Sequence, residues 1–110
     1  MKVSSQTPPR RFTVKKVTIS HVADIDLEPD ELITFKTESG AEYDIARKDW
    51  GFYATPSING RLTDKGLRTA LVSNPEERLY VLLVEPSKMA SFVAYCEEQS
   101  ITVLKWLDET

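Results

Sequence analysis

Apolar and polar residues alternate in two parts of the first half of the chain, and each alternation predicts β-structure. In residues 12–23, FTVKKVTISHVA, the alternation stops at Lys15 and Lys16 and then resumes as far as Ala23. Two adjacent lysines inside such a run indicate a bulge or a twisted edge strand. Residues 32–46 alternate on both sides of Glu38, Ser39 and Gly40, which predicts a β-hairpin.

The second half of the chain predicts three strands and one helix. Residues 69–73, TALVS, form a short strand, and residues 79–85, LYVLLVE, are apolar on both faces, which is typical of a central strand. The last strand covers residues 101–108. A right-handed helical crossover would place that strand parallel to residues 79–85.

A helix is predicted at residues 87–99, after Pro86 ends the preceding strand. Ser87 is the expected N-cap. Apolar residues then recur at the spacing of one helical face, and the residues that follow are polar. The expected buried stripe consists of Met89, Phe92, Val93 and Cys96, and the expected solvent-facing residues are Glu97, Glu98 and Gln99.

These elements predict an α+β fold. We expect a mixed, mostly antiparallel sheet of about six strands, curled or barrel-like, with one packed helix near the C-terminus. Residues 1–11 are polar and hold two adjacent prolines, so we expect a flexible or extended leader there. Residues 12–110 would form a single α+β domain.

Composition fits this interpretation and suggests a location. The chain has 110 residues, 41% of them hydrophobic, and a single cysteine, so an internal disulfide cannot form. The first residues lack the apolar run of a signal peptide, and no stretch approaches the roughly 18 apolar residues of a membrane span. We therefore expect a cytoplasmic protein without a membrane partner.

Charge is unevenly distributed along the chain. Residues 1–23 carry five basic side chains and no acid, and residues 24–44 carry eight acids against one lysine. Residues 45–74 hold five basic groups and two acids. Since the net charge is −3, nucleic acid is not an expected partner, and an anionic ligand would be drawn to the basic middle block.

The sequence lacks the common catalytic and metal-binding patterns. It has one cysteine and one histidine, so no Cys/His metal site is expected. His21 and Cys96 are better explained as sheet and core residues than as a catalytic pair. The acidic run at residues 24–31 has Pro29 where a calcium loop needs glycine. We expect no catalytic residue, no metal and no cofactor.

Residues 49–68, DWGFYATPSINGRLTDKGLR, follow neither a helical nor a strand period and are the best candidate site. Aromatic rings stack on sugars and bases, and arginine forks bind carboxylate or phosphate. The candidate ligand-binding residues are Trp50, Tyr53, Thr55, Ser57, Asn59, Arg61 and Arg68.

A structural explanation of the same segment stays open. Its rings, together with Leu62, would then close one end of the sheet, and its arginines would pair with Asp49 and Asp64. Asn59 and Gly60 would alternatively form the tip of a hairpin.

Three functions remain after these exclusions. The leading hypothesis is a non-enzymatic binding or accessory domain whose ligand is small, polar and anionic, such as a phosphorylated sugar or a nucleotide, held at residues 49–68. The second is a metal-independent enzyme that uses the same segment. The third is a protein–protein interaction module that forms a homodimer through an edge strand, either the strand with Lys15 and Lys16 or the last strand.

Overall fold

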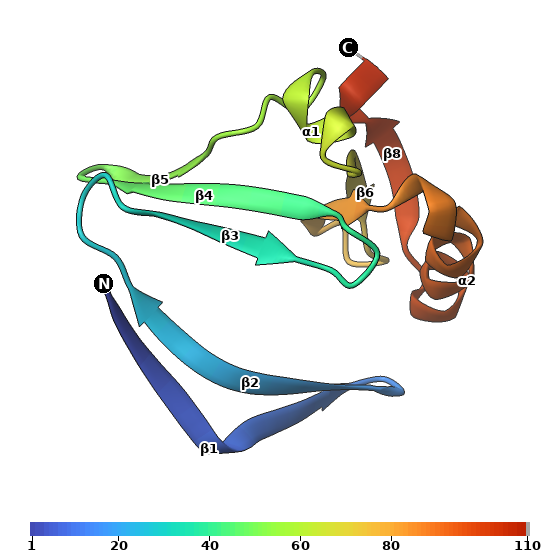
Figure 1. Cartoon of the computed structure of the whole chain (residues 1–110). Coiled ribbons are helices and arrows are strands. Elements are labelled where there is room, and N and C mark those ends of the chain that lie inside the picture. Colours follow the sequence, from blue (N-terminus) through green and yellow to red (C-terminus); the bar gives the residue numbers. More distant parts are fainter. Residues whose placement is uncertain (110) are drawn as a thin grey trace. The chain divides into compact units, whose positions relative to one another are not determined.

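The computed structural model describes residues 1–109 (Figure 1). Within this range the strands form three antiparallel sheets, ordered β1-β2, β3-β4-β5 and β7-β6-β8. The strands are β1 (Lys2–Val14), β2 (Val17–Asp26), β3 (Leu32–Lys36), β4 (Glu42–Lys48), β5 (Gly51–Ala54), β6 (Arg68–Ser73), β7 (Leu79–Val84) and β8 (Thr102–Trp106). The helices are α1 (Arg61–Asp64), the 3-10 turn η1 (Pro86–Lys88), α2 (Met89–Gln99) and the 3-10 turn η2 (Leu107–Glu109).

The α+β class and the single long helix near the C-terminus are confirmed. The expectation of mostly antiparallel pairing is confirmed. The expectation of one sheet of about six strands is wrong, because eight strands are divided among three sheets in the described residues, and none of these sheets closes into a barrel. Two strands are additional: the predicted strand of residues 12–23 is split between β1 and β2, and β5 lies in the segment that was predicted to be irregular.

The chain divides into two compact units. The first contains Met1–Leu32 and Ala46–Tyr53, and the second contains Ile33–Ile45 and Ala54–Thr110. The sheet β3-β4-β5 contributes residues to both units.

The first unit is built around a long β-hairpin, here called the arm, which consists of β1 and β2 (Figure 1). Lys15 and Lys16 form its two-residue turn, with Val14 paired to Val17 and a φ of 54° at Lys15. The prediction of a bulge at the two lysines is therefore wrong, because the chain reverses there. The expected leader, residues 1–11, lies in β1 apart from Met1, and its residues 2–5, 10 and 11 pair with β2.

Regular pairing in the arm is interrupted only in β1. Ser5 pairs with Ala23 and Arg10 pairs with His21, so residues 6–9 lie opposite the single residue Val22. Pro8 and Pro9 lie in this interruption. Proline has no N–H to donate to a ladder, which explains why the regular pairing stops there.

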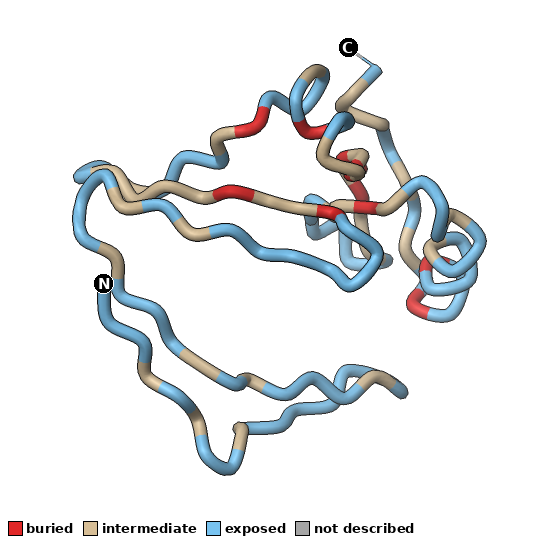
Figure 2. The backbone as a smooth tube through the Cα atoms, viewed as in Figure 1, coloured by how far each residue is buried: buried red, intermediate tan, exposed pale blue. Residues whose placement is uncertain are grey.

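The second unit contains the hydrophobic core. Ala41, Leu62 and Leu67 form its buried cluster, and Tyr43 and Leu83 pack against it. The buried residues lie outside the arm, as Figure 2 shows.

The strand at the centre of the C-terminal sheet is β6, not β7. Thr69, Ala70 and Val72 of β6 are buried, and neighbouring residues of a strand point to opposite faces, so both faces of β6 are covered. Leu79, at the start of β7, is exposed, and β7 lies at one edge of the sheet. The prediction of residues 79–85 as the central strand, parallel to the last strand, is wrong, since β8 pairs antiparallel with β6.

Helix α2 packs through most of the predicted stripe, since Met89 and Phe92 are half-buried and Cys96 is buried. Cys96 and Gln99 are buried, whereas Val93 is exposed, so the predictions for Val93 and Gln99 are wrong. The N-cap is Lys88 instead of Ser87, because η1 precedes α2. The expectation that Cys96 is buried is confirmed, and burial raises the pKa of its thiol. No helix among residues 1–109 is long and apolar enough to cross a membrane.

Candidate functional site

The predicted site at residues 49–68 is divided between the two units. The segment comprises a turn, β5, an irregular stretch, α1 and the first residue of β6. Trp50 and Tyr53 belong to the first unit. Thr55, Ser57, Asn59, Arg61 and Arg68 belong to the second.

The aromatic side chains of this segment are solvent-exposed. Trp50 is 71% exposed, Phe52 68% and Tyr53 51%. The structural explanation of this segment requires the rings to be packed against the end of a sheet. Their exposure does not support that explanation. Leu62, the fourth residue in that explanation, is buried in the second unit's core.

The guanidinium of Arg68 is bound to other parts of the second unit. Its Nε donates to Asp108 Oδ2 at 3.0 Å and its Nη2 donates to Glu109 Oε1 at 2.9 Å. The guanidinium also lies 4.1 Å from the ring centroid of Trp106. The hydrogen bond to Asp108 contributes most to the raised pKa of Arg68. Arg68 therefore anchors β6 to η2 and pairs with neither Asp49 nor Asp64.

Arg61 is held far more weakly. Its Nη2 lies 3.7 Å from Asp44 Oδ2, and its side chain is 59% exposed. Lys65 Nζ lies 3.5 Å from the same oxygen. The Thr34 hydroxyl donates to Asp44 Oδ1 at 2.6 Å, and this bond is the largest cause of the lowered pKa of Asp44. Asp44 is thus a buried carboxylate with three partners, and sequence reasoning did not identify it.

The small polar residues of the segment shape the backbone. The Arg61 N–H donates to Ser57 Oγ at 2.9 Å, so Ser57 binds the start of α1. A Cβ atom on Gly60 would lie 2.5 Å from that same Oγ, which explains the glycine. Thr55 N–H donates to the Asp44 carbonyl at 3.1 Å. Asn59 is exposed.

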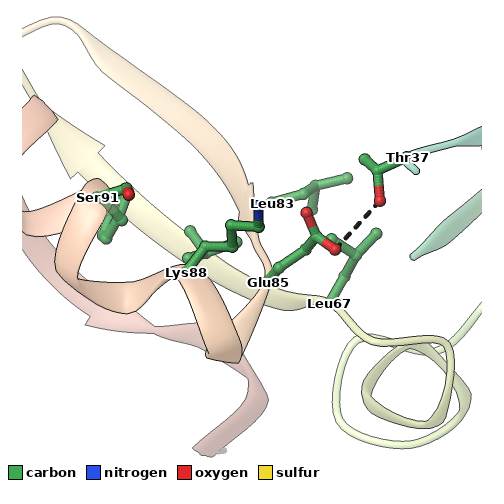
Figure 3. Close-up of a pocket in the computed structure, with 8 residues that line it drawn as sticks. Thr37, Leu67, Leu83, Glu85, Lys88 and Ser91 are labelled. Atoms are coloured by element: carbon green, nitrogen blue, oxygen red, sulfur yellow. Dashed lines mark hydrogen bonds between the residues drawn. The ribbon is translucent and has the colours of Figure 1, made fainter. Parts of the chain in front are cut away.

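A pocket of about 280 Å³ opens elsewhere in the second unit (Figure 3). Leu67 and Leu83 give it an apolar floor, and Lys88 and Ser91 line it from η1 and α2. Glu85 Oε1 accepts a hydrogen bond from the Thr37 hydroxyl at 3.1 Å. Leu67 is the only residue of the predicted segment that lines this pocket.

The arm is amphipathic, and this surface was not recognised from the sequence. Directly paired residues of an antiparallel hairpin share a face. The pairs Val3 with Ile25 and Phe12 with Ile19 therefore place their side chains on the same face as Val14. All five of these residues are exposed. The opposite face is mainly polar and carries residues such as Thr18, Ser20 and Asp24.

The first unit has no core of its own. None of its residues is buried in the structure as described, and the five apolar residues of the arm are at least 40% exposed. A two-stranded hairpin is marginally stable in water, whereas three or more strands with an apolar face can be stable. The arm by itself thus lacks the apolar packing that stabilises larger sheets.

One strand of the arm has a continuous free edge. Among the described strands, β1 is the only hydrogen-bonded neighbour of β2. The outer edge of β1 is interrupted by Pro8 and Pro9, while the ten residues of β2 contain no proline. Such an edge is a template for pairing with another strand. The signal in the sequence was a pair of polar residues between two alternating apolar runs, which also marks a two-residue hairpin turn.

His21 is the one histidine of the chain and lies on β2. Its Nε2 lies 3.0 Å from Asp24 Oδ1 and 3.1 Å from the carbonyl oxygen of Ala23. Both contacts are local, so they fix the ring against its own strand. Among residues 1–109 no cluster of three or more His, Cys, Asp or Glu side chains is arranged to hold a metal ion.

Comparison of the chain with protein-family models, with curated proteins and with solved structures finds no match.

Proposed function

We propose that the protein is a non-enzymatic interaction module that binds another protein chain through the β1-β2 arm. The observation that carries this proposal is the free, proline-free edge of β2 beside an uncovered apolar face. A strand that adds to this edge gains main-chain hydrogen bonds, and pockets between alternate side chains supply specificity.

The geometry of the hairpin identifies the backbone groups that face the partner. Val14 and Val17 flank the two-residue turn, and in such hairpins the flanking pair is hydrogen-bonded. Alternate residues of β2 therefore direct their N–H and C=O groups away from β1, beginning with Thr18 and continuing through Ser20 and Val22. The odd-numbered residues carry the apolar face, with Ile19 and Ile25 among them.

A proline substitution tests the role of this edge. Val22→Pro removes one outward N–H, and Val22 has no directly paired residue in β1. Val22→Thr is the matched control, because it keeps the N–H and a β-branched side chain. Peptides selected from a random display library on the wild-type protein should bind Val22→Thr as tightly. Their binding to Val22→Pro should fall at least tenfold, in line with the loss of about 1.4 kcal/mol or more at a fully paired edge.

Equal binding of the selected peptides by both variants would refute the edge as the binding element. Failure to recover any peptide, together with a chain that does not associate with itself, would refute the interaction function. Circular dichroism of each variant checks that the strands are retained.

A second candidate function is anion binding at Arg61, and it is the surviving form of the small-ligand hypothesis. The exposed Arg61 guanidinium makes one ion contact, at 3.7 Å, and offers five N–H donors. Lys65 and Lys36 lie in the same charged cluster, bridged to Arg61 by Glu42 and Asp44. Arg68 contributes nothing here, because its fork is bound to Asp108 and Glu109.

The anion hypothesis is tested with phosphorylated small molecules. Arg61→Ala should abolish the thermal stabilisation of the protein by a nucleoside monophosphate or a sugar phosphate. Arg78→Ala is the matched control, since Arg78 is also an exposed arginine and also lies 3.7 Å from a carboxylate, that of Glu76. If the two substitutions reduce the thermal stabilisation equally, the ligand binds through the overall charge of the protein, and a site at Arg61 is excluded.

A further inference from the structure

The arm carries opposite charges at its two ends. Residues 10–21, at the tip, contain four basic side chains and no acid. Residues 22–31, where β2 leaves the arm, contain five acids and no basic side chain. The uneven charge along the sequence thus becomes a separation of charge along the length of one hairpin.

Charges at both ends are left without partners inside the chain. Within residues 1–109 the Lys16 ammonium at the tip makes no hydrogen bond or ion pair. The same holds for the carboxylates of Asp26 and Glu28 at the other end. Other acids of this end are satisfied internally, for example Asp30 by Lys48 and Glu31 by the N-terminal amine.

We propose that the partner of the arm is a second copy of this chain, joined by antiparallel pairing of β2 with β2 across a two-fold axis. This inference rests on the interaction function proposed above and names its partner. Antiparallel pairing places the basic tip of each copy beside the acidic end of the other, whereas parallel pairing would bring like charges together. Two-fold symmetry presents the same edge from both copies, so a single surface is sufficient.

Two registers combine the constraints on the pairing with the greatest overlap of the two β2 strands. The apolar residues of both copies must lie on one face, so odd-numbered residues must pair with odd-numbered residues. The outward backbone groups belong to even-numbered residues, which must likewise pair with each other. In both cases the numbers of two paired residues sum to an even value. For β2, which spans Val17–Asp26, the registers with the most overlap are centred on His21 or on Val22. The first places Lys16 opposite Asp26, and the second places Lys16 opposite Glu28.

The resulting four-stranded sheet, ordered β1-β2-β2-β1, explains the composition of both edges. The outer edges of this sheet are the two β1 strands, each interrupted by Pro8 and Pro9. Prolines on an edge strand block further addition, so the pairing closes as a dimer instead of continuing as a fibre. The arm thereby passes from two strands to four strands with one apolar face.

A charge-exchange experiment tests this pairing. One variant carries Lys16→Glu and the other carries Asp26→Lys with Glu28→Lys, which covers both registers. Each variant alone brings like charges together twice per dimer, so its dissociation constant should rise at least about tenfold. An equimolar mixture restores two opposite-charge contacts per heterodimer and should return the dissociation constant to the wild-type value. Sedimentation velocity over a concentration series measures all four samples.

A second measurement fixes the register and does not depend on charge. In a Cys96→Ala chain, Val22→Cys should form a disulfide-linked dimer if the axis passes through Val22, and His21→Cys should do so if it passes through His21. Opposed residues of a ladder lie about 4.5–5.5 Å apart at Cα, which a disulfide spans.

The inference is overturned if the wild-type chain is a monomer at every concentration. It is also overturned if the mixture associates no more tightly than its components, or if neither cysteine variant forms a linked dimer. Peptide binding that is lost in Val22→Pro but occurs on a monomeric chain would overturn the second copy as partner while leaving the interaction function in place. Loss of both the dimer and the peptide binding would remove the interaction function itself.

Discussion

Replacement of Leu62 by alanine should strongly destabilise the second unit. Leu62 is 1% exposed and packs with Ala41 and Leu67. Truncation removes Cγ and two methyl carbons, which at about 0.8 kcal/mol per carbon costs roughly 2.4 kcal/mol in transfer free energy. The cavity left behind adds to this cost, so the free energy of unfolding should fall by about 3–4 kcal/mol.

Urea denaturation followed by circular dichroism measures this effect. With an m-value of about 1.5 kcal/mol/M, the midpoint should fall by roughly 2–2.7 M. Leu79→Ala is the matched control in the same unit, because Leu79 is 61% exposed, and it should change the free energy by less than about 0.5 kcal/mol. Equal shifts for the two variants, or a Leu62→Ala cost below about 1 kcal/mol, would contradict the assignment of Leu62 to the core.

Two further predictions concern buried polar groups of the second unit. Thr69 Oγ1 is buried without a hydrogen-bond partner in residues 1–109, so Thr69→Val should raise the free energy of unfolding by about 1 kcal/mol; a lower urea midpoint would show that the hydroxyl is satisfied. The folded-state pKa of Asp44 lies below its ordinary value of 3.8, so its contribution is present above that pH and is lost as the pH falls through the folded-state pKa. Asp44→Asn should therefore flatten the loss of stability below pH 4 in acid titrations, and an unchanged acid limb would contradict this.

The strand and helix content was predictable where local pattern decides it. The hairpin of β3 and β4 and the helix after Pro86 follow from alternation, a glycine turn and a strand-ending proline. The local pattern does not predict the order of the strands within a sheet. Residues 79–85, LYVLLVE, contain β7 and are more apolar than residues 69–73 of β6, TALVS. The central strand is nevertheless β6, which lies between β7 and β8 and has buried residues on both faces.

The partners of charged residues were not predictable from sequence separation. The leading hypothesis gave Arg68 to a ligand, and the structural alternative paired the arginines of the segment with Asp49 and Asp64. Its partners Asp108 and Glu109 lie 40 and 41 residues further along the chain, because β8 pairs with β6 and brings η2 beside it. Of the two arginines in the predicted site, Arg61 alone therefore stays a candidate for anion binding.

The functional interpretation of the arm depends on whether its two lysines form a bulge or a turn. As a bulge, Lys15 and Lys16 would lie within a single edge strand that continues through them. As a turn, they end β1 and begin β2, so that basic and acidic segments become opposite ends of one hairpin. Either structure is compatible with two polar residues between apolar runs, and the pairing of residues 10–14 with residues 17–21 decides between them.

The central claim is that the β2 edge binds a second copy of the chain, and the mass of the protein in solution tests it most directly. One chain has a mass of 12.5 kDa. Sedimentation equilibrium of the wild-type protein should show an average mass that rises with concentration toward twice that value, while Val22→Pro stays at the mass of one chain. A wild-type protein that remains at 12.5 kDa at every concentration would contradict the account.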